Sequence, residues 1–460
     1  MKIIALLLSL SLLVFIHELG HYFFARLFKT RVEKFYLFFN PYFSILRAKK
    51  VNGKWAFSFF SKTAPESFKQ DNDNTEWGIG WVPLGGYCSI AGMIDENNTS
   101  ASKMASEPQK WEYRSKKAWQ RLLIVLGGVI MNFVGALIIF SFILFTWGRE
   151  SLPIQNATQG YDYTEAVLKN GFKNGDIILA VNAKPVSEMS EVIEMMLLDG
   201  SNSCTVKRGN EIVKIDIPKD FAKQLISENS KIFAVPRFPF VIDNFAIGSL
   251  AEKNGMKVGD SIVGINGVPT PTFTDFVAEI ANLKNKEVAV DYYRNGTLAQ
   301  TKFKLDASGK IGAVSRSPYK MYQTKKTEYS FLESIPAGIA QGTESLVNYV
   351  KQFKYVFSKE GASQLGGFGT IGNLFPTSWD WQIFWNMTAF LSIILAFMNI
   401  LPIPALDGGH VMFTLWEMIT GRKPGDKFME RAQMVGMALL FALLIYANGN
   451  DLFRWISAKF

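Results

Sequence analysis

His17, Glu18 and His21 are the residues of this chain whose types and spacing could most clearly do chemistry. They form a His-Glu-x-x-His motif, which on a helix places two imidazoles on one face, about one turn apart, with a carboxylate beside them. That arrangement is typical of a zinc site in which the glutamate acts on water. The flanks are apolar, because residues 3–16 contain no ionisable side chain and residues 22–25 continue the apolar character. Ionisable groups within a membrane span are costly and usually functional, so the motif predicts chemistry inside the bilayer.

A zinc site needs a third protein ligand, and this chain has only three histidines. Asp407 and His410 stand three residues apart at the end of a later apolar stretch and could share a helix face. The spacing alone does not separate them, and either could be a polar residue that faces water at a helix end. Pro402 and Pro404 break the helix just before them, and the freed backbone groups need a polar cavity instead of lipid.

Four stretches are long and apolar enough to span a membrane, namely residues 3–27, 120–147, 383–405 and 432–448. The N-terminal stretch also resembles a signal peptide, but no small-x-small cleavage site closes it, so we expect an intact span. Basic residues follow the first span, precede the second, and fill the connection between the third and fourth. By the positive-inside rule these loops are cytoplasmic, so both termini and the long segment after the second span face the other side.

An internal repeat with an offset of 84 residues lies between the second and third spans. Residues 169–178 recur without a gap as residues 253–262, and each copy has a Gly-Asp pair before an alternating, strand-like segment. The repeat resembles PDZ domains, at residues 152–235 and 236–322, with two small β-rich domains of another kind as the alternative. PDZ domains add an extended peptide to a sheet edge, so the predicted role is to bind or sieve polypeptide.

The net charge of +9 does not indicate nucleic-acid binding, because the Lys and Arg residues are dispersed and concentrate beside the apolar spans. The two cysteines, Cys88 and Cys204, would lie on opposite sides of the membrane, so we expect no disulfide. Residues 329–358 have helical apolar spacing, which predicts a helix on the membrane surface or against the repeats. Ordinary core packing explains that spacing equally well.

The order of these motifs resembles the site-2 protease family of intramembrane zinc metalloproteases, in particular its bacterial RseP-like members. HELGH lies in the first span, residues 399–409 match NxxPxPxLDGG at the third, and the PDZ-like repeats lie between spans, so the resemblance covers nearly the whole chain. It implies a Zn2+ cofactor and favours Asp407 over His410 as the third ligand. The implied zinc ligands are His17, His21 and Asp407, and the implied general base is Glu18.

The resemblance also implies substrate-binding residues near the zinc, namely Asn399, Pro402 and Pro404 of the motif at the third span. Residues 128–133 resemble the family's GPxxNF segment, with Val129 where proline is usual. Asn132 is therefore a candidate to position substrate or to stabilise the oxyanion. A helix–helix hydrogen bond is the commoner use of a membrane asparagine.

Residues 82–87 resemble the family's membrane-associated β-hairpin, which offers a strand edge to an unwound substrate. Alternating apolar residues and the pair Gly85 and Gly86 favour a hairpin by themselves. We therefore count both glycines among the candidate substrate-binding residues.

Together these features predict a polytopic α-helical membrane protein with about four transmembrane helices, a cytoplasmic β-hairpin region and two tandem PDZ domains inserted between the second and third spans. The expected segments are the first transmembrane helix (1–28), a cytoplasmic loop (29–118), the second helix (119–148), PDZ domains (152–235 and 236–322), an amphipathic helix with a Gly-rich connector (323–380), the third transmembrane segment with the LDG motif (381–410), a cytoplasmic loop (411–431), and the fourth helix with a C-terminal tail (432–460).

The resemblance implies a multi-pass protease of the bacterial inner membrane that cuts within the spans of single-pass proteins, such as anti-sigma factors or remnant signal peptides, after a first extracytoplasmic cut. The PDZ pair would exclude bulky ectodomains and bind peptide termini, and lipid would surround the spans. Two other classes compete with this interpretation. One is a membrane scaffold with an inert HELGH, and the other is a metal transporter whose His and Asp residues line an ion path.

Overall fold

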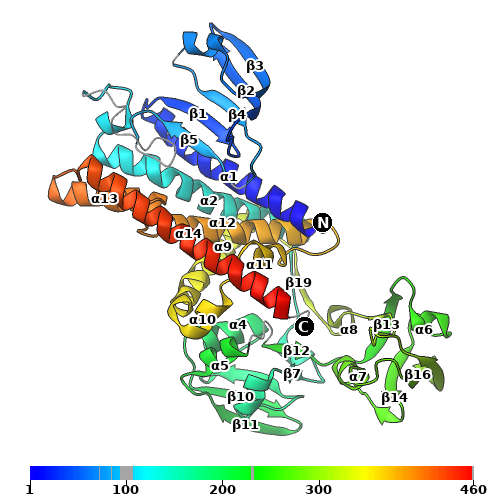
Figure 1. The fold of residues 1–460 in the computed structure, drawn as a ribbon. Helices are drawn as coiled ribbons and strands as arrows, with labels where there is room; N and C mark the ends of the chain where they lie inside the picture. The colour runs from blue at the N-terminus through cyan, green and yellow to red at the C-terminus, as the bar shows by residue number, and fades with distance from the viewer. Residues whose placement is uncertain (72, 84, 94–106, 229–232, 458–460) are drawn as a thin grey trace. The chain divides into compact units, whose positions relative to one another are not determined.

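The computed structural model describes residues 1–71, 73–83, 85–93, 107–228 and 233–457, which form two compact units (Figure 1). The first unit is discontinuous in sequence and contains residues 1–148, 328–357 and 362–460. The second contains residues 149–327 and 358–361. The long segment after the second predicted span therefore folds largely as a unit of its own.

Four helices in the described part of the chain are long and apolar enough to cross a membrane. They are α1 (Lys2–Leu27), α2 (Ala118–Trp147), α12 (Trp381–Ile400) and α14 (Asp426–Ser457). At 1.5 Å per residue, the 30 residues of α2 extend about 45 Å, which exceeds the roughly 30 Å hydrocarbon core of a bilayer. The chain has the helices of a membrane protein, and the four stretches predicted from the sequence each form a helix of sufficient length and apolar composition.

Helices α1, α2 and α12 pack against one another in the first unit (Figure 1). A Cβ atom on Gly20 of α1 would lie 2.1 Å from the carbonyl oxygen of Gly127 on α2, so only glycine permits this crossing. Between α12 and α1, the buried Thr388 hydroxyl donates a hydrogen bond to Ser9 at 3.0 Å. The close crossing brings the motif-bearing face of α1 directly against α2.

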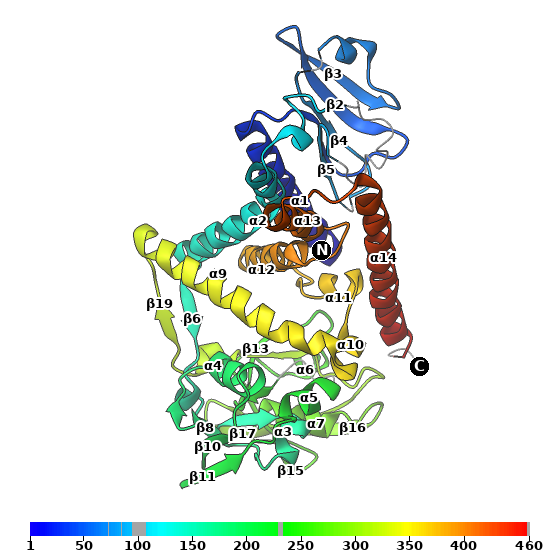
Figure 2. The same ribbon diagram turned by 90° about the vertical axis from the view of Figure 1, so that its left-hand side faces the viewer.

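The helix expected within residues 329–358 is α9 (Phe331–Phe353), followed by a 3-10 turn, η6 (Lys354–Phe357). Figure 2 shows α9 crossing α2, and a Cβ atom on its Gly338 would lie 2.2 Å from Ser141 Oγ of α2. Farther along, Tyr349 packs on Phe397 of α12 with ring centroids 5.4 Å apart. Part of the apolar face of α9 is therefore covered by the helix bundle.

The third membrane segment ends earlier than hydropathy predicts. Helix α12 stops at Ile400, and residues 401–406, with both prolines, form a tight turn. Helix α13 (Asp407–Thr420) then occupies residues assigned from the sequence to the end of the span and to a cytoplasmic loop. Proline is apolar yet removes a backbone donor, so hydropathy does not detect this break. Asp407 suits the positive N-terminal end of α13, and Gly421 ends the helix in the left-handed region (φ 69°).

The predicted loop 29–118 contains a five-stranded sheet in the order β3-β2-β4-β1-β5. The strands are β1 (Val32–Leu37), β2 (Ser44–Val51), β3 (Lys54–Ser61), β4 (Glu76–Ile79) and β5 (Tyr87–Ile90). Strands β1 and β4 are parallel, and the other neighbours are antiparallel. The buried Arg47 guanidinium donates to Tyr36 Oη at 2.9 Å and to Glu76 Oε1 at 2.8 Å, which ties together β2, β1 and β4. Strand β5 is left at one edge.

Among the described residues, no two strands pair with each other directly across Gly85 and Gly86. The tight hairpin joins β2 to β3 instead, through Asn52 and Gly53 with φ of 50° and 81°. Gly85 and Gly86 lead into β5, which pairs with β1, and Leu84 of the predicted hairpin lies outside the described residues. A Cβ atom on Gly86 would lie 2.5 Å from the carbonyl oxygen of Tyr36. The glycine pair therefore permits a close chain approach instead of a turn.

The second unit contains the two copies of the sequence repeat. The first copy has β7 (Tyr161–Tyr163), α3 (Glu165–Lys169), β8 (Ile177–Val181), β9 (Lys184–Pro185), α4 (Met189–Ile193), the π-helical turn η5 (Glu194–Leu198), β10 (Ser203–Arg208), β11 (Glu211–Asp216), α5 (Phe221–Ser227) and β12 (Ala234–Pro236). The second has β13 (Phe240–Phe245), α6 (Leu250–Lys253), β14 (Ser261–Ile265), β15 (Val268–Pro269), α7 (Phe273–Ile280), β16 (Glu287–Arg294), β17 (Thr297–Lys304) and β18 (Ala313–Ser315). Strands β8 and β14 begin 84 residues apart, as do β9 and β15, and β10 and β16.

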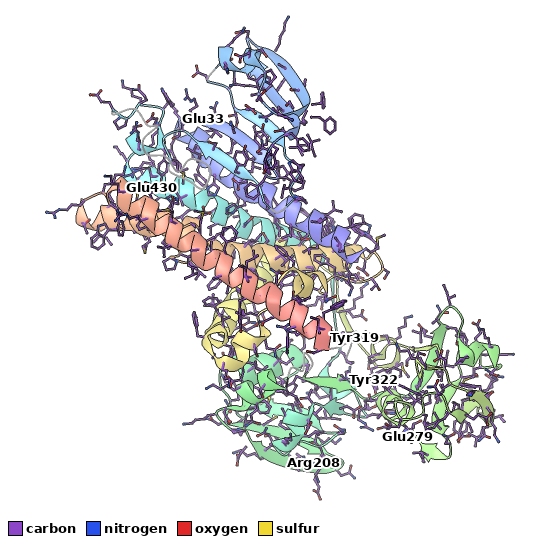
Figure 3. The ribbon with its side chains drawn as sticks, in the orientation of Figure 1. Glu33, Arg208, Glu279, Tyr319, Tyr322 and Glu430 are labelled. Carbon is purple, nitrogen blue, oxygen red and sulfur yellow. The ribbon has the colours of Figure 1, made fainter. Side chains whose placement is uncertain are left out.

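The two copies share the order of four strands and an internal ion pair, and they differ in that β13 joins the main sheet of the second copy whereas β7 does not join that of the first. The orders are β11-β10-β8-β9, and β17-β16-β14-β13-β18 with β15 on β14, while β7 pairs with β12. Arg208, labelled in Figure 3, donates to Asp176 and to the Gly171 carbonyl at 2.8 Å. Arg294 makes the same contacts with Asp260 and Gly255, at 2.7 and 2.8 Å. Each copy has its own apolar core.

The second unit begins and ends in one pair of strands. Strands β6 (Arg149–Ser151) and β19 (Lys325–Thr327) are antiparallel, with Arg149 opposite Thr327 and Ser151 opposite Lys325. The remaining short elements are η1 (Glu66–Gln70), η3 (Tyr113–Ser115), η4 (Ile154–Asn156), α8 (Pro318–Met321), α10 (Lys359–Gln364) and α11 (Phe368–Gly372). Cys88 and Cys204 are both free thiols.

Candidate metal centre

Three side chains from two helices converge within the membrane-helix bundle. His17 and His21 lie one turn apart on α1, with their Nε2 atoms 3.2 Å from each other. Asp407, at the start of α13, places its Oδ2 atom 3.2 Å from His17 Nε2 and 3.4 Å from His21 Nε2. The three side chains form a group that could hold a metal ion.

The spacing and chemistry of these atoms fit zinc. Two imidazole nitrogens and a carboxylate oxygen are ligands that Zn2+ commonly takes, at about 2.0–2.2 Å, and tetrahedral ligands at that distance lie about 3.3–3.5 Å from one another. Asp407 Oδ2 is buried and has no hydrogen-bond partner among the described residues, although two imidazole nitrogens are close to it. A shared cation on which all three lone pairs converge accounts for this arrangement.

The turn before α13 explains how Asp407 reaches the histidines. Ala405 has a φ of 81°, a conformation that is unfavourable for a residue with a side chain. A Cβ atom on Gly408 would lie 2.0 Å from the carbonyl oxygen of Leu401, and one on Gly409 would lie 2.7 Å from Pro404 Cα. The glycines therefore allow the turn to fold tightly onto the helix that carries Asp407.

A cavity of about 200 Å³ opens beside the three ligands. Glu18 lines it and accepts a hydrogen bond from the backbone N–H of Cys88 on β5. Asn399 and Gly86 also line it, and Asn399 Nδ2 lies 3.5 Å from His17 Nε2. The other lining residues are His17, His21, Tyr87, Cys88, Ile90, Met93, Ala405, Leu406, Asp407, His410 and Gln433.

The structure separates the remaining predicted residues from this cavity. Asn132 is fully buried and contacts His17 without lining the cavity. Gly85, Pro402 and Pro404 do not line it either. Gly85 packs near the Phe39 ring, and Pro404 lies against Gly436 of α14. The prolines therefore shape the turn that positions Asp407.

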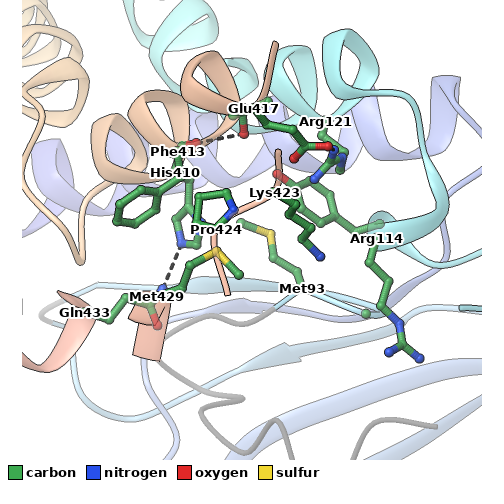
Figure 4. Close-up of a pocket in the computed structure, with 13 residues that line it drawn as sticks. Met93, Arg114, Arg121, His410, Phe413, Glu417, Lys423, Pro424, Met429 and Gln433 are labelled. Atoms are coloured by element: carbon green, nitrogen blue, oxygen red, sulfur yellow. Dashed lines mark hydrogen bonds and ion pairs between the residues drawn. The ribbon is translucent and has the colours of Figure 1, made fainter. Parts of the chain in front are cut away.

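His410, the other candidate third ligand, points to a different partner. Its Nε2 atom lies 2.9 Å from the Gln433 amide of α14 (Figure 4). His410 also lines a smaller cavity of about 50 Å³, where Arg121 donates to Glu417 at 2.5 Å. Burial raises the pKa of Tyr113 in this smaller cavity to about 12, so the phenol is neutral at physiological pH.

Sequence reasoning missed Cys88, Ile90 and Gln433 among the lining residues. Cys88 and Ile90 carry no chemical motif, and only their position on an edge strand beside Glu18 reveals them, whereas Tyr87 belongs to the segment 82–87 that was expected to offer a strand edge. Gln433 had a weaker signal, since it is a polar residue near the start of an otherwise apolar span. Its contact with His410 depends on how α14 packs.

Comparison with known sequences now decides the family. The profile of peptidase family M50 matches residues 5–61 and 58–443, which is most of the chain. The chain belongs to peptidase family M50. The resemblance to site-2 proteases drawn from HELGH and the LDGG segment is thereby confirmed.

Relatives of this M50 member match over nearly their whole length. A Borreliella burgdorferi protein whose name includes the words zinc metalloprotease is 27% identical over 470 residues, covering 98% of each chain. A similarly named Neisseria meningitidis protein is 25% identical, covering 98% of this chain and 99% of its own. Metalloprotease MmpA of Caulobacter vibrioides is 24% identical, covering 100% of this chain and 97% of its own. The M50 member is a metalloprotease, and its cofactor is zinc.

Proposed function

We propose that this M50 member hydrolyses peptide bonds within the transmembrane segments of single-pass membrane proteins. In this proposal His17, His21 and Asp407 bind zinc, and Glu18 is the general base. The supporting observation is that three ligand atoms 3.2–3.4 Å apart adjoin a cavity lined by Glu18. Two of those ligands lie on a helix that is apolar enough to span a membrane.

In this proposal, zinc and the side chains around the cavity have separate roles in hydrolysis. Zinc supplies Lewis acidity and makes water a competent nucleophile near neutral pH. Glu18 accepts the proton from the attacking water and later delivers it to the leaving amine. The Cys88 N–H, which donates to the Glu18 carboxylate, holds that base against β5.

Strand β5 and Asn399 are proposed to hold the substrate. A peptide bond inside a helix is shielded by the helix's own hydrogen bonds, so the substrate span must unwind before it is cut. An unwound segment can add as a further strand to the outer edge of β5, which lies at the end of its sheet and lines the cavity. Asn399, which lines the same cavity, is placed to donate to a substrate carbonyl.

The two repeat copies are proposed to be PDZ domains that act as a size filter outside the cytoplasm. Their support is the 84-residue offset of corresponding strands and the Gly-Asp segment in each copy. A bulky ectodomain would be excluded until a first protease trims it, and peptide termini would bind at a sheet edge. The basic loops support an extracytoplasmic position of the insert on an inner membrane, and the proposed substrates there are anti-sigma-factor-like proteins and remnant signal peptides.

The test uses purified full-length protein in detergent and a tagged single-pass substrate that has been trimmed outside the membrane. We expect cleavage by the wild type, and none after zinc is removed with a chelator. Glu18→Gln should bind zinc normally and lose cleavage by about 10²-fold or more, because it lacks the base. Glu66→Gln, at an exposed site, is the matched control and should cleave normally. Normal cleavage by a folded, zinc-loaded Glu18→Gln protein would contradict the proposed base.

A further inference from the structure

One face of α2 lies directly behind the two imidazoles. Ile124, Gly128 and Asn132 are spaced four residues apart on this face. The backbone carbonyl oxygen of Ile124 is 2.9 Å from His21 Nδ1. The Asn132 side-chain amide is 3.2 Å from His17 Nδ1. Each imidazole therefore turns Nε2 toward Asp407 and Nδ1 toward α2.

The two asparagines near His17 lie on opposite sides of its ring. Asn399 lines the cavity and is close to Nε2, the nitrogen that faces Asp407. Asn132 is fully buried, does not line the cavity and approaches Nδ1. The Ser392 hydroxyl of α12 also donates to the Asn132 backbone carbonyl at 2.7 Å, which fixes this turn of α2. Asn132 is therefore placed to act on the histidine and not on a substrate in the cavity.

The chemistry of imidazole determines what Asn132 has to supply. A neutral imidazole carries one proton, so a ring that binds a metal through Nε2 carries that proton on Nδ1 and needs an acceptor there. The Ile124 carbonyl meets this need for His21. In the structure Asn132 turns Nδ2 toward His17 and leaves Oδ1 buried with no partner among the described residues. A 180° rotation of the amide exchanges the two atoms and supplies the acceptor.

We propose that Asn132 is a positioning residue for His17, whose side-chain oxygen accepts the Nδ1–H and holds Nε2 toward the metal. This rests on the proposed zinc site of His17, His21 and Asp407, and it replaces the substrate or oxyanion role suggested by the sequence. Residues that orient a metal-binding histidine in this way typically contribute about 10- to 100-fold to metal affinity.

The experiment measures the zinc affinity of full-length protein in detergent by competition with a chromogenic chelator, so the readout does not depend on cleavage. Asn132→Leu, which keeps the size but removes the acceptor, should weaken zinc binding about 10- to 100-fold. Asn132→Asp, which restores an acceptor, should bind within about threefold of wild type, because a carboxylate is a common partner of a metal-binding histidine. Asn399→Leu is the matched control on the cavity side and should bind zinc normally while losing cleavage.

The outcomes separate this inference from the proposed function. Wild-type zinc affinity in His17→Ala would refute the proposed ligand set itself. Loss of zinc in His17→Ala together with wild-type affinity in Asn132→Leu would refute only the role of Asn132. Equal melting temperatures of the zinc-stripped wild type and variant verify folding.

A second measurement covers the case in which Asn132→Leu does not fold. Because the chain has three histidines, ¹⁵N-histidine NMR of the zinc-loaded wild type can report the tautomer of each ring. We expect a hydrogen-bonded Nδ1–H on His17, and a His17 ring that binds zinc through Nδ1 would overturn the proposal.

Discussion

Gly128 carries no functional group, yet it controls the space around the proposed metal ligands. A Cβ atom on this residue would lie 2.5 Å from His17 Cε1 and 2.6 Å from His21 Nε2. Both distances are too short for any side chain to be tolerated without moving a ring. The absence of a side chain on α2 is therefore a requirement of the site.

Gly128→Ala should lower zinc affinity by at least tenfold, because the added methyl group displaces both imidazoles from Asp407. Gly135→Ala is the matched control on the same helix, since its Cβ atom would lie an ordinary 3.5 Å from Ile16. Chelator competition on both variants checks this expectation. Equal zinc affinity in the two variants would show that α2 shifts to accommodate the methyl group and that its packing does not fix the positions of the histidines.

At this scale the sequence indicates the candidate site residues better than it indicates their surroundings. His17, Glu18 and His21 could be recognised because a helix fixes their geometry locally. Asp407 could not be separated from His410 by spacing, because the choice depends on a turn of six residues and on the contact between His410 and Gln433. The side of His17 that Asn132 faces depends on how α1 crosses α2, and no local pattern encodes that.

Among the elements, the turn at residues 401–406 is the one on which several others depend. It follows the last residue of α12 and precedes the first residue of α13. It also packs closely against α14, because a Cβ atom on Gly436 of α14 would lie 1.6 Å from the carbonyl oxygen of Pro404. Hydropathy finds the membrane helices, since each is long and apolar, but it cannot find this turn or the strand order of the preceding sheet. Those features arise from contacts between distant segments.

Gly436→Ala should destabilise the protein by about 1–3 kcal/mol, the usual range for overpacking, and reduce cleavage, because α14 must move away from the turn. Gly449→Ala in the same helix has open space around its Cβ position and should be neutral or stabilising by about 0.5–1 kcal/mol, because alanine favours helix. Thermal unfolding in detergent and cleavage of the trimmed substrate measure both effects. Similar losses of stability and cleavage in the two variants would mean that α14 tolerates no added methyl group at either site, and that the contact with the turn is not the cause.

The ion pair inside the second repeat copy predicts a pH dependence. Burial alone would raise the pKa of Asp260, but the Arg294 guanidinium and the Lys257 backbone N–H hold it below its ordinary value of 3.8. A carboxyl whose pKa is lower in the folded state stabilises that state above the ordinary value, and this contribution is lost as pH falls below it. We expect β14 and β16 to open more readily below about pH 4, and Asp260→Asn to remove this dependence. Hydrogen exchange of the full-length protein, corrected for the intrinsic effect of pH, measures how readily these strands open. An unchanged pH dependence of that opening in Asp260→Asn would show that other groups cause it.

For the whole molecule, the pairing of β6 with β19 means that the insert leaves and rejoins the first unit at one place. Opposed residues in antiparallel strands have Cα atoms about 4.5–5.5 Å apart. The opposed pair nearest the rest of the insert is Ser151 of β6 and Lys325 of β19. Residues 152–324 can therefore be replaced by an Asn-Gly turn, which suits a two-residue connection between antiparallel strands.

This replacement should preserve zinc binding and cleavage of trimmed substrate, and it should permit cleavage of substrate with an intact ectodomain. A matched control replaces the same residues with an unrelated folded domain, which should restore discrimination if bulk alone is the cause. The measurement is the ratio of cleavage rates for trimmed and untrimmed substrate. An unchanged ratio in the shortened protein would refute the filter.

The discontinuous first unit also sets the order of events during synthesis. His17 and His21 are made early, but 386 residues separate His21 from Asp407. At about 5–20 residues per second, the ribosome needs roughly 20–80 s to cover that interval. Under the proposed ligand set, the nascent chain holds His17, Glu18 and His21 throughout that interval without Asp407. On this proposal the catalytic site is incomplete until translation is almost finished, so the protease cannot cleave other membrane proteins before then.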